Sequence, residues 1–187
     1  MKILAVAGSC RLGNTKYLVD VAVAEIVNTY RNLDITNIHL KDISMNFCCG
    51  CLDCDSTGKC IYSDDMTDLV SIARDADGLI LATPARWGLL SGEMKTFLDR
   101  LNPLAVREEL NGKKAIVIAV GQSEEDDSES IRFAAESLVT FCNNAGICVL
   151  DTVMVCGCYS YSDASTNLEA ITACKSAGKH LLNNIQS

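Results

Sequence analysis

The sequence lacks a long apolar stretch. A membrane-spanning helix requires about 18 consecutive apolar residues, and every uninterrupted apolar run in this sequence is much shorter. The first such run, ILAVA, ends at Gly8 and is too short to be the apolar region of a secretory signal. We therefore expect no membrane partner and a cytoplasmic location, where thiols stay reduced.

The sequence also has no excess of positive charge. It contains 16 lysine and arginine residues against 24 aspartate and glutamate residues, for a formal net charge of -8. Such a balance argues against nucleic acid or an anionic membrane as the main partner, because both repel an acidic surface. Histidine is scarce too. His39 and His180 fall in an expected strand and helix, so we predict structural rather than catalytic roles.

Internal repeats, low-complexity segments and linkers are absent, which favours one domain over residues 1–187. Short apolar runs alternate with segments whose apolar residues recur at helical spacing. This alternation predicts an α/β domain whose parallel sheet is covered on both faces. The expected strands are residues 2–8, 35–40, 78–84, 113–121 and 147–156. The expected helices are around residues 18–26, 64–77, 91–101, 131–141 and 164–182.

In such sheets, ligands bind outside the carboxyl ends of the strands. The segments that follow the first four strands are therefore expected along one edge of the molecule. They read GSCRLGNT, FCCGCLDCDSTGKC (residues 47–60), TPARWG and GQSEEDDSES.

The first of these segments has the composition of a phosphate-binding loop. Ser9 and Thr15 offer hydroxyl groups, Arg11 offers a planar cation, and the following helix offers free N–H groups at its positive end. It is not a Walker A loop, because Asn14 stands where lysine is required, and GxGxxG is absent. A Cys-x5-Arg phosphatase loop fails because Lys16 replaces the arginine. The alternative is an ordinary strand-to-helix turn with a capping residue.

Three segments resemble one known family. Gly-Ser-x-Arg-x-Gly-Asn-Thr from Gly8 resembles the FMN-phosphate loop of the NAD(P)H-dependent FMN reductases, and residues 76–100 resemble their second flavin loop. The pattern CxxCxxCxxxxxC followed by DDM resembles the subgroup called iron–sulfur flavoproteins. The resemblance implies a flavodoxin-like three-layer sandwich with a five-stranded parallel sheet in the order 2-1-3-4-5. It also implies a homodimer or homotetramer.

The same resemblance assigns residues to FMN. Two positions depart from the family pattern: Cys10 replaces a proline and Arg86 replaces a tyrosine. Trp87 is expected either to border the flavin ring in place of that tyrosine or to pack against the next helix. By resemblance the phosphate is held by Ser9, Arg11, Gly13, Asn14 and Thr15, and the ring is bordered by Pro84, Ala85, Arg86, Trp87 and Gly88, with Gly121, Gln122 and Ser123 on its other side.

The cysteine-rich stretch has the spacing Cys48-x2-Cys51-x2-Cys54-x5-Cys60, with Cys49 left over. Three cysteines at x2-x2 spacing are typical of ferredoxin-like [4Fe–4S] ligation. Zinc and free, redox-active thiols remain alternatives. Five other cysteines lie in the carboxyl-terminal third: Cys142, Cys148, Cys156, Cys158 and Cys174. They are predicted to be mostly core residues, except that Cys156-Gly-Cys158 is expected at the ligand edge.

These features predict an FMN-binding oxidoreductase of the iron–sulfur flavoprotein type. It would transfer electrons between a reduced donor and FMN through a [4Fe–4S] cluster held by Cys48, Cys51, Cys54 and Cys60. The donor and the acceptor are expected to be small molecules or proteins, with NAD(P)H as a possible donor. The alternatives are a cluster-free NAD(P)H-dependent FMN or quinone reductase, a non-catalytic electron carrier, and a zinc-dependent interaction module.

Overall fold

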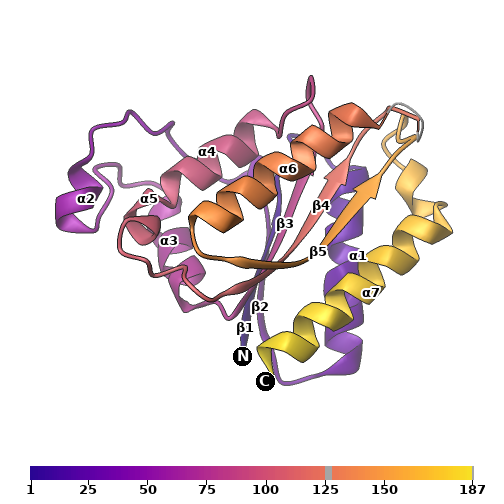
Figure 1. Ribbon diagram of the computed structural model, residues 1–187, viewed down its shortest axis with the longest axis horizontal. Coiled ribbons are helices and arrows are strands. Elements are labelled where there is room, and N and C mark those ends of the chain that lie inside the picture. The colour runs from indigo at the N-terminus through magenta and orange to yellow at the C-terminus, as the bar shows by residue number, and fades with distance from the viewer. Residues whose placement is uncertain (125–127, 187) are drawn as a thin grey trace.

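The structure is a computed structural model that describes residues 1–124 and 128–186. Five parallel strands form one sheet in the order β2-β1-β3-β4-β5 (Figure 1), which confirms the predicted order. The strands are β1 Lys2–Ala7, β2 Asp34–His39, β3 Gly78–Pro84, β4 Lys114–Val120 and β5 Cys148–Val155.

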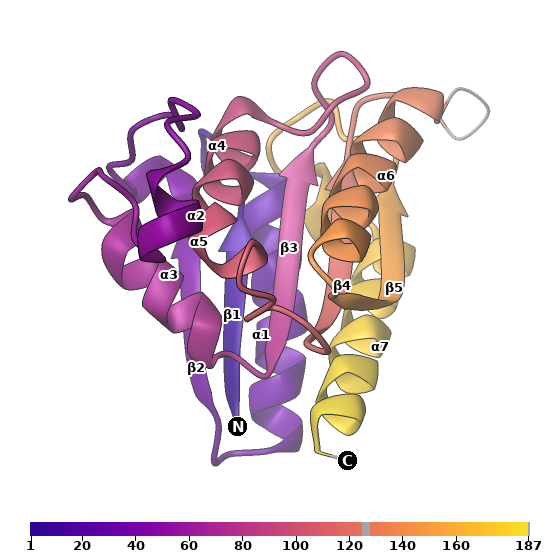
Figure 2. The same cartoon turned by 60° about the vertical axis from the view of Figure 1, so that its left-hand side comes forward.

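Helices cover both faces of the sheet, as the alternating pattern predicts (Figure 2). One face carries α1 Asn14–Thr29 and α7 Leu168–Ile185, which pack against each other. The other face carries α3 Met66–Asp75, α4 Gly92–Arg100 and α6 Glu129–Asn144. The described residues also form four shorter elements: η1 Leu40–Asp42, α2 Asp53–Thr57, α5 Asn102–Ala105 and η3 Asp163–Ser165.

The side chains on the two faces of β1 pack into separate halves of the core. Leu4 and Val6 pack beneath α3, α4 and α6, whereas Ile3, Ala5 and Ala7 pack beneath α1 and α7. All five side chains are buried. A strand covered on both sides has no solvent-facing position, so it reads as a continuous apolar run. Burial of each leucine, isoleucine or valine side chain contributes about 1.5–3 kcal/mol.

The last helix begins later than its apolar periodicity predicts. It starts at Leu168 rather than near residue 164, because Asn167 caps it: the Asn167 side chain accepts a hydrogen bond of 2.9 Å from the Ala170 N–H group. The segment before it forms the short turn η3 instead. The short helices α2 and α5 were not predicted either, since four or five residues carry no readable period.

All five strands end at the same edge of the sheet, the upper edge in Figure 2. The segment after β2 is the longest of the connections that leave this edge, and it carries α2 out to one side of the molecule (Figure 1). Within the described residues, no helix is both long and apolar enough to cross a membrane.

Candidate functional site

A cavity of about 490 Å³ opens at this edge, between the segments that follow β1, β3, β4 and β5. It brings together twelve of the thirteen residues predicted for FMN. The thirteenth, Gly88, lies beside it, because its N–H group donates to Oγ of the cavity-lining residue Ser130 at 3.0 Å. The twelve are Ser9, Arg11, Gly13, Asn14, Thr15, Pro84, Ala85, Arg86, Trp87, Gly121, Gln122 and Ser123.

The charge of this cavity is opposite to that of the whole chain. Its described lining includes Arg11 and Arg86 but no aspartate or glutamate. The net charge of the chain is nevertheless -8. A positively charged concave site in an acidic protein favours an anionic ligand.

The first loop leaves β1 at a point where only glycine fits. A Cβ atom on Gly8 would lie 2.8 Å from Cβ of Met94 and 3.0 Å from the Ala82 carbonyl oxygen. The Gly8 N–H group extends the sheet by donating to Ala82 at 2.7 Å, while its carbonyl accepts from the Ser91 hydroxyl. Ser91 also caps α4 by accepting from the Met94 N–H group at 3.1 Å. The loop is therefore fixed to the start of α4.

Helix α1 begins at this loop without a side-chain cap. Gly13 is its N-cap residue, so no side chain occupies the N–H groups of the first turn, which have no acceptor within the helix. Both polar atoms of the Asn14 side chain are used elsewhere: Nδ2 donates to the Ser160 carbonyl at 2.7 Å and Oδ1 accepts from the Ala164 N–H group at 3.0 Å. Asn14 therefore offers a ligand its backbone rather than its side chain. An uncapped first turn of this kind favours an anionic ligand.

Ser9 is held from two sides. Its hydroxyl donates to the Arg11 carbonyl at 2.9 Å, and Nε2 of His39 lies 2.8 Å from the same oxygen. Both Ser9 and His39 are 5% exposed. Burial lowers the pKa of His39 below its usual value, so the ring is neutral at pH 7. Sequence reasoning missed this contact, because the parallel register that places His39 beside Ala7 is not readable from either segment alone.

The loop after β3 forms a tight turn. Arg86 and Leu89 exchange backbone hydrogen bonds of 2.8 and 2.9 Å across it, and Trp87 and Gly88 have positive φ angles of 52° and 75°. Trp87 is 101% exposed, so the prediction that it packs against the next helix is wrong. A bulky residue at positive φ is strained. The indole stands at the mouth of the cavity, where it is free to meet a ligand.

The far wall is built by the segments after β4 and β5, which are tied together by their backbones. Gly121 accepts from the Cys158 N–H group at 2.9 Å, and Ser123 accepts from the Gly157 N–H group at 2.9 Å. A Cβ atom on Gly121 would collide with Cγ1 of Ile131, so glycine lets this segment pack closely against α6. Of the predicted segment GQSEEDDSES, residues 125–127 lie outside the described part of the chain.

Three lining residues were not predicted: Val120, Ser130 and Cys158. Its sequence context did point to Cys158, because Cys156-Gly-Cys158 was expected at the ligand edge. It is buried, and this burial raises its pKa to about 11. No sequence feature pointed to Val120 or Ser130, because a valine at the end of a strand and a serine in the first turn of a helix are common in any protein.

The five cysteines of residues 47–60 line a second, small cavity of about 40 Å³. Asn102 Nδ2 donates to the Sγ atom of Cys54 at 3.1 Å. Among the described residues, however, no three histidine, cysteine or acidic side chains are arranged to hold a metal ion. A hydrogen bond to Tyr62 lowers the pKa of Cys49, the cysteine outside the predicted ligand set. The lining cysteines are Cys48, Cys49, Cys51, Cys54 and Cys60.

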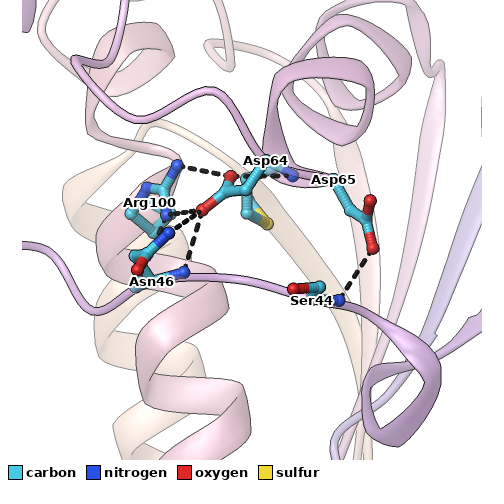
Figure 3. Close-up of polar contacts among 6 residues, drawn as sticks. Ser44, Asn46, Asp64, Asp65 and Arg100 are labelled. Atoms are coloured by element: carbon cyan, nitrogen blue, oxygen red, sulfur yellow. Dashed lines mark hydrogen bonds and ion pairs between the residues drawn. The ribbon is translucent and has the colours of Figure 1, made fainter.

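A buried clamp joins the two ends of this cysteine segment (Figure 3). Arg100 donates two hydrogen bonds of 2.8 Å to the Asp64 carboxylate and one of 2.7 Å to the Asn46 carbonyl. The Asn46 N–H group donates back to Asp64 at 2.9 Å. The side chains of Arg100 and Asp64 are 1% and 7% exposed, and the pairing holds the pKa of Asp64 far below its usual range. Asp64, which follows the cysteines in the sequence, and Arg100, the last residue of α4, thus meet in space.

Of the remaining cysteines, Cys142 and Cys174 are core residues as predicted, and burial raises the pKa of each to about 12. Cys148 is exposed, so the prediction that it is a core residue is wrong. It opens β5, the edge strand of the sheet, in which none of the first five residues is buried.

The chain is similar to known flavoproteins. The family model for NADPH-dependent FMN reductase matches residues 1–156. An iron–sulfur flavoprotein from Archaeoglobus fulgidus is 35% identical over 130 residues, which cover 67% of this chain and 58% of that protein. Another, from Methanocaldococcus jannaschii, is 34% identical over 131 residues, or 70% and 67% of the two chains. The similarity thus spans less than two thirds of the first relative.

Solved structures show the same fold. An NADH:FMN oxidoreductase in its apo form superposes with a TM-score of 0.73 at 22% identity, covering 98% of this chain and 89% of the other. Flavodoxin 1 from Bacillus cereus superposes with a TM-score of 0.67 at 20% identity, covering 98% of each chain. Together with the family match, they confirm the flavodoxin-like architecture predicted from the sequence. The chain belongs to the NADPH-dependent FMN reductase family of flavin-dependent oxidoreductases and, within it, to the iron–sulfur flavoprotein subgroup.

Proposed function

We propose that the chain binds FMN in the 490 Å³ cavity and works as an oxidoreductase that takes electrons from NAD(P)H or another reduced donor. One observation carries the proposal: a single cavity joins the uncapped start of α1 to the loops after β3 and β4. The phosphate of FMN would bind at the start of α1, and its flat ring would lie between the two loops. The volume lies within the about 300–1,000 Å³ range of small-molecule sites.

The residues of the cavity have distinct tasks in this proposal. Ser9, Thr15, Arg11 and the first N–H groups of α1 bind the phosphate. Arg86 adds positive charge beside the ring and so favours its uptake of electrons. Gly121, Gln122 and Ser123 line the same cavity and border the ring from the other side. Bound FMN supplies transfer of one or two electrons, and the protein supplies orientation and charge.

The second part of the proposal concerns the cysteine segment. Its donor set suits an iron–sulfur cluster, since Cys48, Cys51, Cys54 and Cys60 are all thiols around one cavity. Asn102 already donates to one of these sulfurs, as the surroundings of clusters commonly do. We propose that these four cysteines hold a [4Fe–4S] cluster. Because the described thiols are not gathered into a metal site, loading would rearrange the segment between its clamped ends.

A cluster-free NAD(P)H-dependent reductase is the second candidate, and the ungathered thiols favour it. The two candidates differ in iron but share the flavin cavity. A homodimer or homotetramer is proposed for both. The exposed Trp87, which lines the cavity, and the exposed Leu89 of the same turn are available to a neighbouring subunit.

The experiment is purification without oxygen, followed by an absorbance spectrum and by measurement of flavin, iron and acid-labile sulfide per chain. One FMN with about four iron and four sulfide is expected, together with NADH or NADPH oxidation at a flavin-dependent rate. FMN and turnover without iron after reconstitution would support the cluster-free reductase. A chain that binds neither FMN nor iron would overturn the whole proposal.

A further inference from the structure

His39 lies at the boundary between the sheet and the phosphate loop. It is the last residue of β2, paired in register with Ala7, the last residue of β1. Its side chain is buried, and its Nε2 atom lies 2.8 Å from Oγ of Ser9. It does not line the flavin cavity itself, so any effect on a ligand must pass through Ser9.

The hydrogen bonds around Ser9 assign the proton on the His39 ring. A serine hydroxyl has one proton, and that of Ser9 is donated to the Arg11 carbonyl at 2.9 Å. The contact of 2.8 Å must then be donated by Nε2–H of His39 and accepted by Ser9. This leaves Nδ1 as a lone pair, and Nδ1 has no hydrogen-bond partner among the described residues. Protonation of the ring would place an N–H group there, buried and without an acceptor.

Charged groups near the ring do not change this assignment. Asp42 and Lys41 of η1 and Lys16 of α1 act on His39 through space with opposite signs, and burial outweighs them in lowering its pKa. The neutral Nε2–H form is therefore the stable one at pH 7.

We propose that His39 is a positioning residue that donates to Ser9, keeps the Ser9 hydroxyl proton directed toward the phosphate loop, and thereby favours FMN over riboflavin. This inference rests on the proposed binding of FMN. Because His39 donates to the Ser9 oxygen, the Ser9 proton points away from the ring, toward an acceptor in the loop. That acceptor is the Arg11 carbonyl in this structure, and a phosphate oxygen would take its place when FMN binds. A phosphate dianion presents only acceptors and matches that donor. Riboflavin has no phosphate and gains nothing from it.

The test compares two substitutions of similar length. His39→Gln keeps an N–H donor near the position of Nε2, whereas His39→Met removes it. Fluorescence titration of flavin-free protein at pH 7 is expected to show FMN affinity about 3- to 10-fold weaker in His39→Met, with riboflavin affinity unchanged. His39→Gln should recover most of the loss. Equal weakening for both ligands, or no recovery by glutamine, would mean a purely structural role and overturn the inference.

A double-mutant cycle adds a second readout. In a Ser9→Ala background, His39→Met should have no further effect on FMN affinity, because the group through which it acts is gone. An additive loss would overturn the inference. If the wild type binds FMN and riboflavin equally, the proposed phosphate site fails, and this inference fails with it. A wild type that prefers FMN together with an unaffected His39→Met variant would overturn this inference alone.

The ring proton can also be observed without any substitution, should His39→Met not fold. In the wild type, ¹⁵N chemical shifts of His39 are expected to report a neutral ring protonated at Nε2 at pH 7. A ring protonated at Nδ1, or at both nitrogens, would contradict the assignment on which the inference is built.

Discussion

The proposed flavin cavity lies at the edge of the sheet from which the cysteine segment also leaves, but the two regions are held in different ways. The described walls of the cavity come from segments that are tied to each other by backbone hydrogen bonds close to the strand ends, such as Gly8 to Ala82 and Cys158 to Gly121. The cysteine segment is long and mostly exposed, and it is clamped at its ends by Arg100 and Asp64. The sheet therefore fixes the walls of the cavity directly, whereas the cysteine segment is fixed at its two ends.

Substitution of the cysteines is expected to have the largest effect and to separate the two regions most clearly. Replacing Cys48, Cys51, Cys54 or Cys60 by serine exchanges a soft thiolate for a poor ligand, so the reconstituted chain should lose its iron. FMN content should not change, since the cavity is built from other segments. Iron, sulfide and flavin per chain are the measurements. Cys49→Ser is the matched control, because Cys49 lines the same small cavity and should leave the iron in place.

The next effect concerns the clamp. Arg100→Met leaves the buried Asp64 carboxylate without its partner and should lower the free energy of unfolding by about 3–5 kcal/mol. Urea denaturation measures it. Lys95→Met, which removes an exposed ion pair with Asp99 on the same helix, should change stability by at most about 1 kcal/mol. Equal losses in the two variants would show that the clamp contributes no more than a surface pair.

A smaller effect is expected for Arg11→Ala, which removes a charge-assisted contact to the proposed phosphate. FMN affinity should fall by about 1.5–3 kcal/mol, or about 10- to 100-fold, while riboflavin affinity stays the same. Arg31→Ala is the control, since Arg31 is exposed and does not line the cavity. A loss of riboflavin affinity equal to that of FMN would place Arg11 away from the phosphate.

The clamp also predicts a pH dependence. The pKa of Asp64 is lower in the folded chain than in the unfolded chain, so the unfolded chain takes up its proton first as the pH falls. The stability from this pair is therefore complete above about pH 4, the ordinary value for aspartate, and declines below it. Urea denaturation from pH 7 to pH 3 should show this decline, and Asp64→Asn should flatten it. An unchanged slope in that variant would assign the decline to other carboxylates.

The sequence predicts local features better than contacts between distant segments. The run at residues 78–84 gives β3 within its observed bounds, because a buried strand is apolar along its whole length. Twelve of the thirteen residues predicted for FMN line one cavity, since the ends of parallel strands meet at one edge. The bond from His39 to Ser9 spans 30 residues and the clamp from Asp64 to Arg100 spans 36, so neither follows from a local pattern.

Titration of the flavin-free wild-type protein with FMN and with riboflavin, before iron is added, tests the central claim most directly. The account predicts one FMN per chain, bound at least about 10-fold more tightly than riboflavin, because the first loop and the start of α1 recognise the phosphate. The affinity should not depend on later loading of the cysteine segment. Equal affinity for the two flavins, or FMN binding only after iron is added, would contradict it.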